Sequence, residues 1–471
     1  MTAWADIVGA DNVITGSAAA PHLTDWTGAY TGAADAVLRP GNTAEVARIV
    51  VAARAQQVPI TVQSGNTSVS GGSVPGPRGG IVLSLSRMNR IRQIDTAART
   101  ATVDAGVVLQ TLQEAVADQG LDFPLMFAAR GTAQIGGALA TNAGGSNVLR
   151  YGNARDLCLG VEAVMADGQV IHGLTGLRKD NSGYDLRHLL CGSEGTLGII
   201  TAAVLRLLPT PRVRATAFLS LADLGAALDV LNAFQDATGG LVEAFEWLPG
   251  EMLRAILAHR PDLRAPMEEI AETQVLVELA STRADDARPT EDGQSHLDRV
   301  LMQVLQEAME AGHIRDGAIA QSGAQRAAFW AVREAVLETL SAHDFAHIDA
   351  SLPLSEVPAF IDKAAPLAAS AGVRPLLVGH LGDGNIHYAV VPANDTAPDI
   401  DTFFDRLTDL LIAHRGSFSA EHGIGRAKAG LLAARKDPAQ LTAMRAIKQA
   451  LDPEGLLNPG VLFDAPNLGK D

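Results

Sequence analysis

The chain has 471 residues, well beyond the roughly 250–300 at which a single hydrophobic core usually stops growing, so two or three domains are expected. Hydrophobic residues make up 47% of the sequence and charged residues 19%, proportions that exclude a disordered or fibrous protein. The net charge of −16 repels phosphate backbones, so nucleic acid is not an expected partner, and an anionic substrate would need a local cation.

The N-terminal region shows no pattern of a targeting or membrane segment. The first basic residue is Arg39, so no charged region precedes an apolar one, and no apolar run in the sequence is long enough to span a bilayer. The two cysteines, Cys158 and Cys191, lack CxxC spacing, and a chain of this size needs no disulfide. A soluble protein of the cytoplasm is therefore expected.

Residues 1–209 are predicted to form the first domain, in which short β-like runs alternate with helices and with loops of small residues. A helix over about 43–57 is indicated by Asn42 or Thr43 as its N-cap and by a single apolar face, which is typical of a surface helix packed on a sheet.

Two segments of this domain concentrate glycine with small polar residues, QSGNTSVSGGS (63–73) and RGTAQIGGALATNAGGS (130–146). Such runs let successive backbone N–H groups converge on an anion, because glycine has no Cβ to block close approach. Tight turns are the alternative interpretation of each loop taken alone, and two in one domain favour a pyrophosphate site. The sequence has no GxGxxG after a strand and no GxxxxGK[ST], which argues against a Rossmann or P-loop site.

Together with GSEGTLGIIT (192–201), these loops resemble the FAD-binding segments of the p-cresol methylhydroxylase and vanillyl-alcohol oxidase superfamily. Some members of that superfamily tether the flavin through His or Cys in the first loop. Residues 63–73 contain neither, so non-covalent FAD is expected. By motif, the resemblance assigns the pyrophosphate to Gly65, Asn66, Thr67, Gly71 and Gly72, and the rest of FAD to Thr132, Gly136, Gly137, Thr141, Asn142, Gly145, Glu194, Gly198 and Ile199.

Two further patterns lie toward the end of this domain. Residues 159–173 alternate in the manner of a hairpin around the turn pair Asp167-Gly168. Pro209 and Pro211 then follow a long apolar run and indicate a domain boundary.

A second domain is predicted over 210–450, followed by a C-terminal segment, 451–471, that returns to the first domain. Strand-like runs alternate here with long helical patterns, which indicates an antiparallel sheet with helices on one face. The strand-like runs are ATAFLSL, VEAFEWL, TQVLVELA and HIDASLP. The expected fold class is therefore α+β, with a two-subdomain FAD-binding domain of the p-cresol methylhydroxylase type implied by the resemblance.

The segment PLLVGHLGDGNIHYAVV (375–391) consists of two apolar runs around the turn-forming LGDGNI, so a hairpin is predicted. On one continuous strand His380 and His387 would point to opposite faces. Folded back across the turn, the two can lie nearly opposite one another and offer two imidazole nitrogens to one metal. A structural role is the alternative for each histidine alone.

A third ligand is predicted in SAEHG (419–423), where Glu421 and His422 follow a short β-like run. Two histidines and a carboxylate are a common set for catalytic zinc, and manganese and iron are alternatives. HLGDGNIH and AEHGIG resemble the metal motifs of the D-2-hydroxyglutarate and D-lactate dehydrogenase branch, which implies that His422 is the base. NPG (458–460) resembles the terminal return of that branch to the flavin and adds Asn458 to the FAD site.

The local cation demanded by the net charge is expected to be the metal together with Arg333, in FWAVREAVLETL (329–340). A surface ion pair is the alternative role of this arginine, whereas the resemblance implies that it binds substrate. Three other substrate positions depart from the D-2-hydroxyglutarate pattern and carry no matching polar group. They are Leu337, His347 and Ala389. A shift toward a different or less polar 2-hydroxy acid is therefore expected.

The resulting hypothesis is FAD- and metal-dependent oxidation of a D-2-hydroxy acid to the 2-oxo acid, with His422 as base and hydride transfer to FAD. A D-2-hydroxyglutarate-specific dehydrogenase and a glycolate or D-lactate oxidase are alternatives within the class. A metal-dependent hydrolase and a non-catalytic nucleotide-binding module are alternatives outside it. The sequence does not decide the electron acceptor, for which an electron-transfer flavoprotein, a quinone or a cytochrome would serve, and a homodimer is compatible with it.

Overall fold

The computed structural model of the chain describes residues 2–76, 79–291, 293–394 and 398–463. The chain forms two compact units, and each is built from separate stretches of sequence. The first unit comprises Met1–Gly144, Asn153–Pro209 and Glu421–Asp471; the second comprises Gly145–Gly152 and Thr210–Ala420.

The boundaries of the units differ in two places from the expected ones. The last boundary falls between Ala420 and Glu421 and not after residue 450, so the whole segment from Glu421 onward belongs to the first unit. The short stretch Gly145–Gly152, just beyond the second glycine loop, belongs to the second unit, where it contributes the helix α5 (Val148–Tyr151). The Tyr151 hydroxyl donates to Glu243 of that unit at 2.7 Å.

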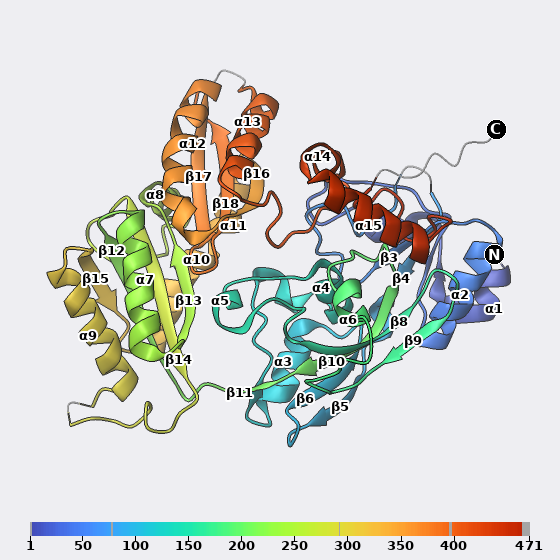
Figure 1. Cartoon of the computed structure of the whole chain (residues 1–471), viewed down its shortest axis with the longest axis horizontal. Coiled ribbons are helices and arrows are strands. Elements are labelled where there is room, and N and C mark those ends of the chain that lie inside the picture. The colour runs from blue at the N-terminus through green and yellow to red at the C-terminus, as the bar shows by residue number, and fades with distance from the viewer. Residues whose placement is uncertain (1, 77–78, 292, 395–397, 464–471) are drawn as a thin grey trace. The chain divides into compact units, whose positions relative to one another are not determined.

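The first unit contains a four-stranded and a five-stranded sheet (Figure 1). The four-stranded sheet has the order β1-β2-β4-β3, in which β2 and β3 both run parallel to β4. Its strands are β1 (Val13–Ile14), β2 (Ala36–Leu38), β3 (Ile60–Gln63) and β4 (Ile81–Ser84). The antiparallel five-stranded sheet has the order β5-β6-β10-β8-β9. Its strands are β5 (Ile91–Asp95), β6 (Thr100–Asp104), β8 (Cys158–Val164), β9 (Val170–Gly173) and β10 (Ile199–Arg206).

The expected surface helix is α2 (Thr43–Ala55), and its start is fixed as predicted, because the Asn42 side chain accepts a hydrogen bond from the backbone N–H of Glu45. Its apolar face is fully buried in a core shared with both sheets.

The predicted hairpin is also confirmed, since β8 and β9 pair antiparallel around the turn at Gly168. The remaining elements of the first unit are α1 (Thr2–Val8), α3 (Leu109–Ala117), α4 (Ile135–Thr141), α6 (Leu186–Leu190), α14 (Ala429–Arg435), α15 (Pro438–Leu451), and the short pair β7 (Leu121–Asp122) and β11 (Leu208–Pro209).

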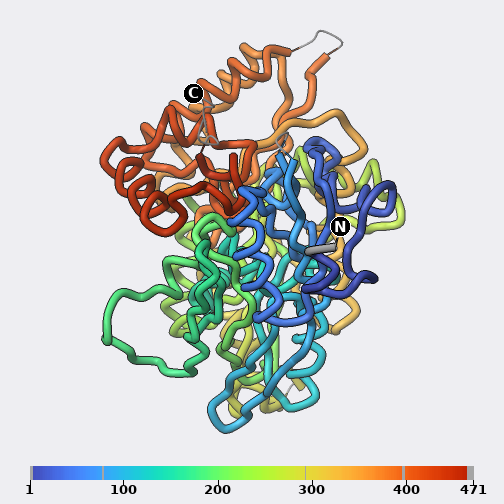
Figure 2. The backbone as a smooth tube through the Cα atoms, turned by 90° about the vertical axis from the view of Figure 1, so that its right-hand side faces the viewer, coloured from blue at the N-terminus to red at the C-terminus, as the bar shows by residue number. Residues whose placement is uncertain are grey.

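The C-terminal segment completes the first unit by running beside β3. The backbone N–H of Ile60 donates to Leu456, and the N–H of Asn458 donates back to Ile60. Figure 2 shows this red segment returning to the blue N-terminal part of the chain. The expected return of the C-terminal segment therefore includes its hydrogen bonding to β3, the edge strand of the four-stranded sheet.

The second unit is built on one antiparallel seven-stranded sheet, which confirms the α+β class. Its order is β15-β12-β14-β13-β17-β18-β16. The strands are β12 (Val213–Leu221), β13 (Val242–Trp247), β14 (Thr273–Ser281), β15 (Ile314–Ile319), β16 (Ala346–Ser351), β17 (Val373–His380) and β18 (Asn385–Pro392). All four strand-like runs and the histidine hairpin are therefore strands of this sheet.

Helices cover both faces of this sheet, so the expectation of helices on one face was wrong. One face packs on α8 (Gly250–His259), α10 (Gly323–Glu334) and α11 (Val336–Ser341). The other face carries Tyr388, which packs edge-on against Phe360 of α12 (Val357–Ala371) and beside Phe403 of α13 (Ile400–Ala413). The helices α7 (Leu224–Thr238) and α9 (His296–Glu310) complete the unit. When both sides of a strand are apolar, the sequence does not show whether helices cover one side of the sheet or both.

Among the described residues, no helix combines the length and hydropathy needed to cross a bilayer.

Candidate active site

The two glycine loops meet within the first unit. They can approach closely because glycine has no Cβ at the points of contact. A Cβ on Gly65 would lie 2.3 Å from the carbonyl oxygen of Thr132, and one on Gly137 would lie 3.1 Å from Ser64. The first loop follows β3, and the second leads into α4. The two loops that the sequence singled out are therefore neighbours in space, and the pyrophosphate site stays a prediction.

The first loop also offers backbone donors that the protein does not use. Within the described residues, the N–H groups of Thr67, Ser68 and Val69 donate to no protein acceptor. The side chain of Asn66 is engaged, since it donates to the carbonyl oxygen of Thr24 at 3.0 Å and accepts from Ser73 at 2.7 Å. The loop thus presents main-chain donors suited to a pyrophosphate, and the Asn66 side chain fixes its shape.

The predicted flavin-binding residues lie in the first unit, with the exception of Gly145, which begins the stretch that belongs to the second. Asn458 connects two of the predicted segments, because its side chain accepts from the N–H of Val62 at 2.7 Å and donates to the carbonyl oxygen of Glu194 at 2.6 Å. Asn142 accepts from the N–H of Arg155 at 3.0 Å, and the Thr141 hydroxyl donates to Gly137 at 3.0 Å. These polar side chains hold the loops in place.

Glu194 has a role that the sequence motif does not indicate. Its two carboxylate oxygens each accept one backbone hydrogen bond at 2.8 Å, from Ile424 and from Gly425. Burial raises the pKa of this carboxyl above its ordinary value, while the two N–H donors and the charge of Lys428 act in the opposite direction. The carboxylate therefore anchors the loop that follows His422.

The same loop is pinned to the first glycine loop. The Ser70 hydroxyl donates to the carbonyl oxygen of His422 at 3.2 Å, and the carbonyl oxygen of Ser70 accepts from the N–H of Arg426 at 2.9 Å. Gly425 has φ +55°, and a Cβ there would lie 2.0 Å from the Ser70 carbonyl oxygen. Glycine is required at this contact, which fixes the backbone around His422 against the first glycine loop.

We expect Glu194→Gln to slow flavin reduction by substrate roughly tenfold or more, because the amide keeps one acceptor and turns an N–H donor toward the loop. The rate is measured by anaerobic stopped-flow absorbance, and the FAD content by the visible spectrum of the purified variant. Ser70→Ala, which removes the hydroxyl bonds to the carbonyl oxygens of His422 and Gly423, should slow the reaction less. Loss of FAD with an unchanged rate per bound flavin would instead mean that Glu194 serves the flavin directly.

Glu421 and His422 lie in this loop with their side chains 3.8 Å apart and partly exposed. The short β-like run expected before them is reduced to one bridge, in which Ser417 pairs with Ser351. The residues from 418 to 428 form no strand. The imidazole of His422 takes part in none of the main-chain contacts that anchor its loop.

His380 and His387 lie on one face of the sheet of the second unit. The register differs in detail from the expected one, because His380 pairs with Asn385 and His387 pairs with Val378. The two histidines are therefore diagonal neighbours and not directly opposite. Their rings meet edge-on with centroids 5.4 Å apart, and ligand nitrogens of the two lie within 4.8 Å of each other.

Two buried carboxylates hold these histidines. Glu246 of β13 is 1% exposed and lies 2.8 Å from Nδ1 of His380, and Asp349 of β16 lies 3.8 Å from Nδ1 of His387. Asp349 also accepts from the Asn385 side chain and from the backbone N–H of Ala420, both at 3.1 Å. Nitrogen and carboxylate donors of this kind suit zinc, manganese or iron.

Arg333 is neither a free cation nor a surface residue. Its guanidinium donates from Nε to Oε2 of Glu246 at 2.7 Å, and its side chain is 13% exposed. Burial raises the pKa of Glu246, but the adjacent His380 and Arg333 outweigh that effect and hold the pKa below its ordinary value. The carboxylate therefore stays ionised between a histidine and an arginine.

The three departures from the substrate pattern have different environments. Ala389 pairs with His347 across β18 and β16, and it is buried in the apolar cluster that includes Leu376 and Val391. His347 is exposed and stacks against Phe345 with ring centroids 5.6 Å apart. Leu337 lies on α11 and is 40% exposed.

The sequence patterns single out neither Glu246 nor Asp349 as site residues. A signal for Glu246 was available in VEAFEWL, since a carboxylate within an otherwise apolar central strand is buried only if it is paired. The partner could not be read from the sequence, because Arg333 lies 87 positions away.

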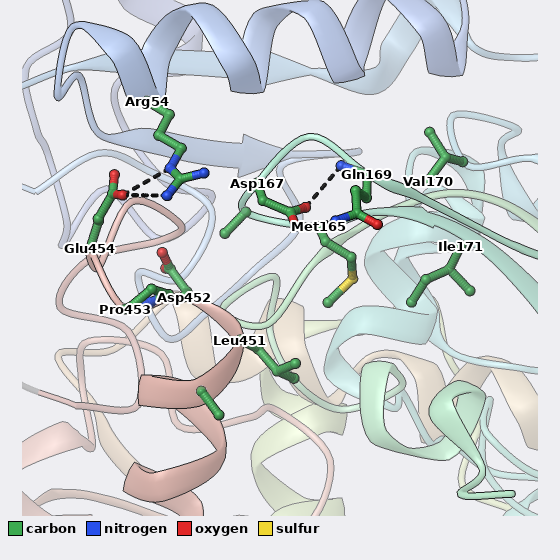
Figure 3. Close-up of a pocket in the computed structure, with 12 residues that line it drawn as sticks. Arg54, Met165, Asp167, Gln169, Val170, Ile171, Leu451, Asp452, Pro453 and Glu454 are labelled. Atoms are coloured by element: carbon green, nitrogen blue, oxygen red, sulfur yellow. Dashed lines mark hydrogen bonds and ion pairs between the residues drawn. The ribbon is translucent and has the colours of Figure 1, made fainter.

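A pocket of about 400 Å³ in the first unit lies between the end of α15 and the turn of the β8–β9 hairpin (Figure 3). The guanidinium of Arg54 at its edge pairs with Glu454 at 2.7 Å. Asp167 accepts from the Gln169 side chain at 2.8 Å. Among the described residues that line this pocket, none belongs to the predicted FAD, metal or substrate sets, so the pocket carries none of the predicted chemistry.

Two family models match this chain, and the second begins directly after the boundary at Pro209. Residues 34–173 match the FAD binding domain family, and residues 210–462 match the family described as FAD linked oxidases, C-terminal domain. A protein named D-2-hydroxyglutarate dehydrogenase from Xanthomonas citri pv. viticola is 38% identical over 452 residues, with 94% of this chain and 92% of the relative covered. The mitochondrial D-2-hydroxyglutarate dehydrogenase of Bos taurus is 36% identical, with 93% and 78% covered.

Solved structures with low sequence identity share the fold. The structure of p-cresol methylhydroxylase with substrate bound is 18% identical and superposes with a TM-score of 0.75, covering 98% of this chain and 96% of that one. Alkyldihydroxyacetonephosphate synthase is 17% identical, with a TM-score of 0.70 over 96% of this chain and 82% of that one. At this level of identity the likeness concerns the fold alone.

Proposed function

Since this chain belongs to the family of FAD-linked oxidases, we propose that it oxidises a D-2-hydroxy acid to the 2-oxo acid with non-covalent FAD and a divalent metal. The two relatives named D-2-hydroxyglutarate dehydrogenase support this substrate class, because their sequences match 94% and 93% of the chain. One observation carries the proposal furthest: a histidine suited to a metal and an arginine suited to a carboxylate share the carboxylate of Glu246.

In this proposal His380, His387 and Glu421 would hold the metal, with zinc as the expected ion. Glu421 directly follows Ala420, whose backbone N–H donates to Asp349, and Asp349 lies 3.8 Å from His387. Glu421 is therefore one residue away in the sequence from a backbone partner of Asp349, which supports its choice as the third ligand.

The chain's own groups would supply binding and proton transfer. When bound, FAD supplies the acceptor for the hydride from C2, and the metal supplies a Lewis acid at the hydroxyl. The neutral imidazole of His422 would take the hydroxyl proton. The guanidinium N–H groups of Arg333 that Glu246 does not engage would bind the substrate carboxylate, which answers the need for a local cation in a chain of charge −16.

Within this class we expect a less polar acid than D-2-hydroxyglutarate to be preferred. The names of the relatives favour D-2-hydroxyglutarate, whereas Leu337 and the buried Ala389 offer no hydrogen bond to a second carboxylate. The measurement is kcat/KM for D-2-hydroxyglutarate, D-lactate and bulkier D-2-hydroxy acids. Equal or better turnover of D-2-hydroxyglutarate would contradict this preference and leave the substrate class intact.

Anaerobic mixing with D- and L-2-hydroxy acids, with and without a chelator, tests the function itself. Bleaching of the flavin by D-acids alone, and its suppression by the chelator, is the expected result. A colourless protein would contradict the flavoenzyme and favour the metal-dependent hydrolase. Bleaching that the chelator does not affect would remove His380, His387 and Glu421 from the mechanism.

A further inference from the structure

One buried carboxylate in the second unit connects two residues to which the proposed function gives different tasks. Oε2 of Glu246 accepts from Nε of Arg333 and lies 2.7 Å from its Nη2. Both oxygens of the same group lie within hydrogen-bond distance of Nδ1 of His380, at 2.8 and 2.9 Å. His380 and Glu246 also face each other across the pairing of β17 with β13.

We infer that Glu246 is a positioning residue that orders the metal ligand His380 and the substrate-binding Arg333 together. The inference rests on the proposed function, which assigns those two tasks. It extends that function to a residue that would itself touch neither metal nor substrate.

The first part of the argument concerns the tautomer of His380. An ionised carboxylate can only accept hydrogen bonds, so the proton of the neutral imidazole is held on Nδ1. Nε2 is then left with its lone pair, which is the form that binds a metal. Because Glu246 is 1% exposed, water does not compete for this arrangement.

The second part concerns the orientation of Arg333. A buried carboxylate is stable only when it is paired, and Arg333 supplies the charge that compensates Glu246. In return, the contact from Nε and Nη2 fixes the plane of the guanidinium, which is otherwise carried by a long flexible side chain. A guanidinium fixed in this way loses less freedom when it binds a substrate carboxylate.

The test compares Glu246→Gln with a matched control, Glu278→Gln. Glu278 lies on the neighbouring strand β14, is 2% exposed, and accepts from Arg326 of α10 at 2.6 Å and from Trp330 at 3.0 Å. The control therefore also removes a buried carboxylate paired with an arginine of the same helix, but it touches neither His380 nor Arg333. Thermal unfolding and FAD content are recorded for both variants.

Zinc affinity is measured for wild type and variants by competition with a chromophoric chelator, and KM and kcat by flavin reduction. In Glu246→Gln the amide N–H₂ faces donors, so zinc should bind about 10–100-fold more weakly. KM for the preferred hydroxy acid should rise as well, when measured at saturating zinc. The control should keep the zinc affinity of the wild type within about threefold, well short of that loss.

The outcomes separate the inference from the proposed function. Wild-type zinc affinity in Glu246→Gln, or an equal loss in the control, would overturn the role of Glu246 while leaving the metal-dependent reaction in place. A wild-type chain that binds no divalent metal would contradict the proposed function, and the role of Glu246 would fall with it. If Glu246→Gln does not fold, Glu246→Asp keeps the charge on a shorter side chain, and unchanged zinc affinity there would equally overturn the inference.

Discussion

Replacement of His422 by alanine is expected to slow anaerobic reduction of FAD by the preferred D-2-hydroxy acid about 10²–10⁴-fold, the usual contribution of a positioned general base. The variant should keep its FAD and its metal. The reason is structural: the loop is held through the carbonyl oxygen of His422 and the N–H groups of Ile424 and Gly425, none of which the substitution removes. Stopped-flow absorbance gives the rate of FAD reduction, and metal analysis of the same preparation gives its metal content.

The control for this variant is His172→Ala, which removes an exposed histidine of the same unit on β9. It should reduce FAD at the wild-type rate. A rate near that of the wild type in the His422 variant would place the base elsewhere. A slow variant that had also lost its flavin would show that the side chain serves the FAD site.

The second large effect is expected from His387→Ala. As a proposed direct ligand, His387 should on removal weaken zinc binding by more than the ~10–100-fold typical of residues that only orient a ligand. Flavin reduction should fall by about two to three orders of magnitude, which corresponds to several kcal/mol of Lewis-acid stabilisation. Dialysed protein is analysed for metal, and its reduction rate is measured before and after zinc is added back.

His313→Ala is the control for this experiment, because the His313 imidazole lies in the same unit, 3.7 Å from Asp229, and belongs to none of the predicted sites. Its metal content should match that of the wild type. Full activity of a metal-free His387 variant would refute the metal-dependent mechanism. Full metal content with low activity would instead assign His387 to the substrate.

Much of the fold follows from local patterns in the sequence. The start of α2 is set by Asn42 and its buried face by a helical spacing of apolar residues, both of which act within a few positions. The central strands of the second unit were recognisable because they are apolar on both sides. The edge strand β15 was not, since half of its residues are exposed and its sequence, IRDGAI, has no strand-like alternation.

The candidate site was predictable only where its residues form motifs. His380 and His387 share one hairpin, and the turn that pairs His380 with Asn385 places them on one face. The diagonal offset between them depends on the length of the turn, which the motif does not specify. Glu246 and Arg333 come from a strand and a helix far apart in the sequence, and their pairing arises only when the sheet and its helix layer are assembled.

The motif containing Glu194 predicted the domain in which this residue lies, but it did not predict what its carboxylate binds. Glu194 lies in the segment 192–201, which belongs to the first unit as expected. Its carboxylate holds the loop that carries His422. The sequence separation from Ile424 is 230 residues, and nothing in either motif indicates the other. Long-range hydrogen bonds of this kind cannot be derived from spacing.

The discontinuous first unit has a consequence for how the protein is made. β3 takes a hydrogen bond from Asn458 and gives one to Leu456, and the Asn458 side chain accepts from Val62. A ribosome therefore completes the entire second unit before it delivers the residues that close the first. During synthesis, the edge of β3 that binds the C-terminal segment is therefore unpaired until the last residues emerge, and an unpaired strand edge is open to pairing with other chains.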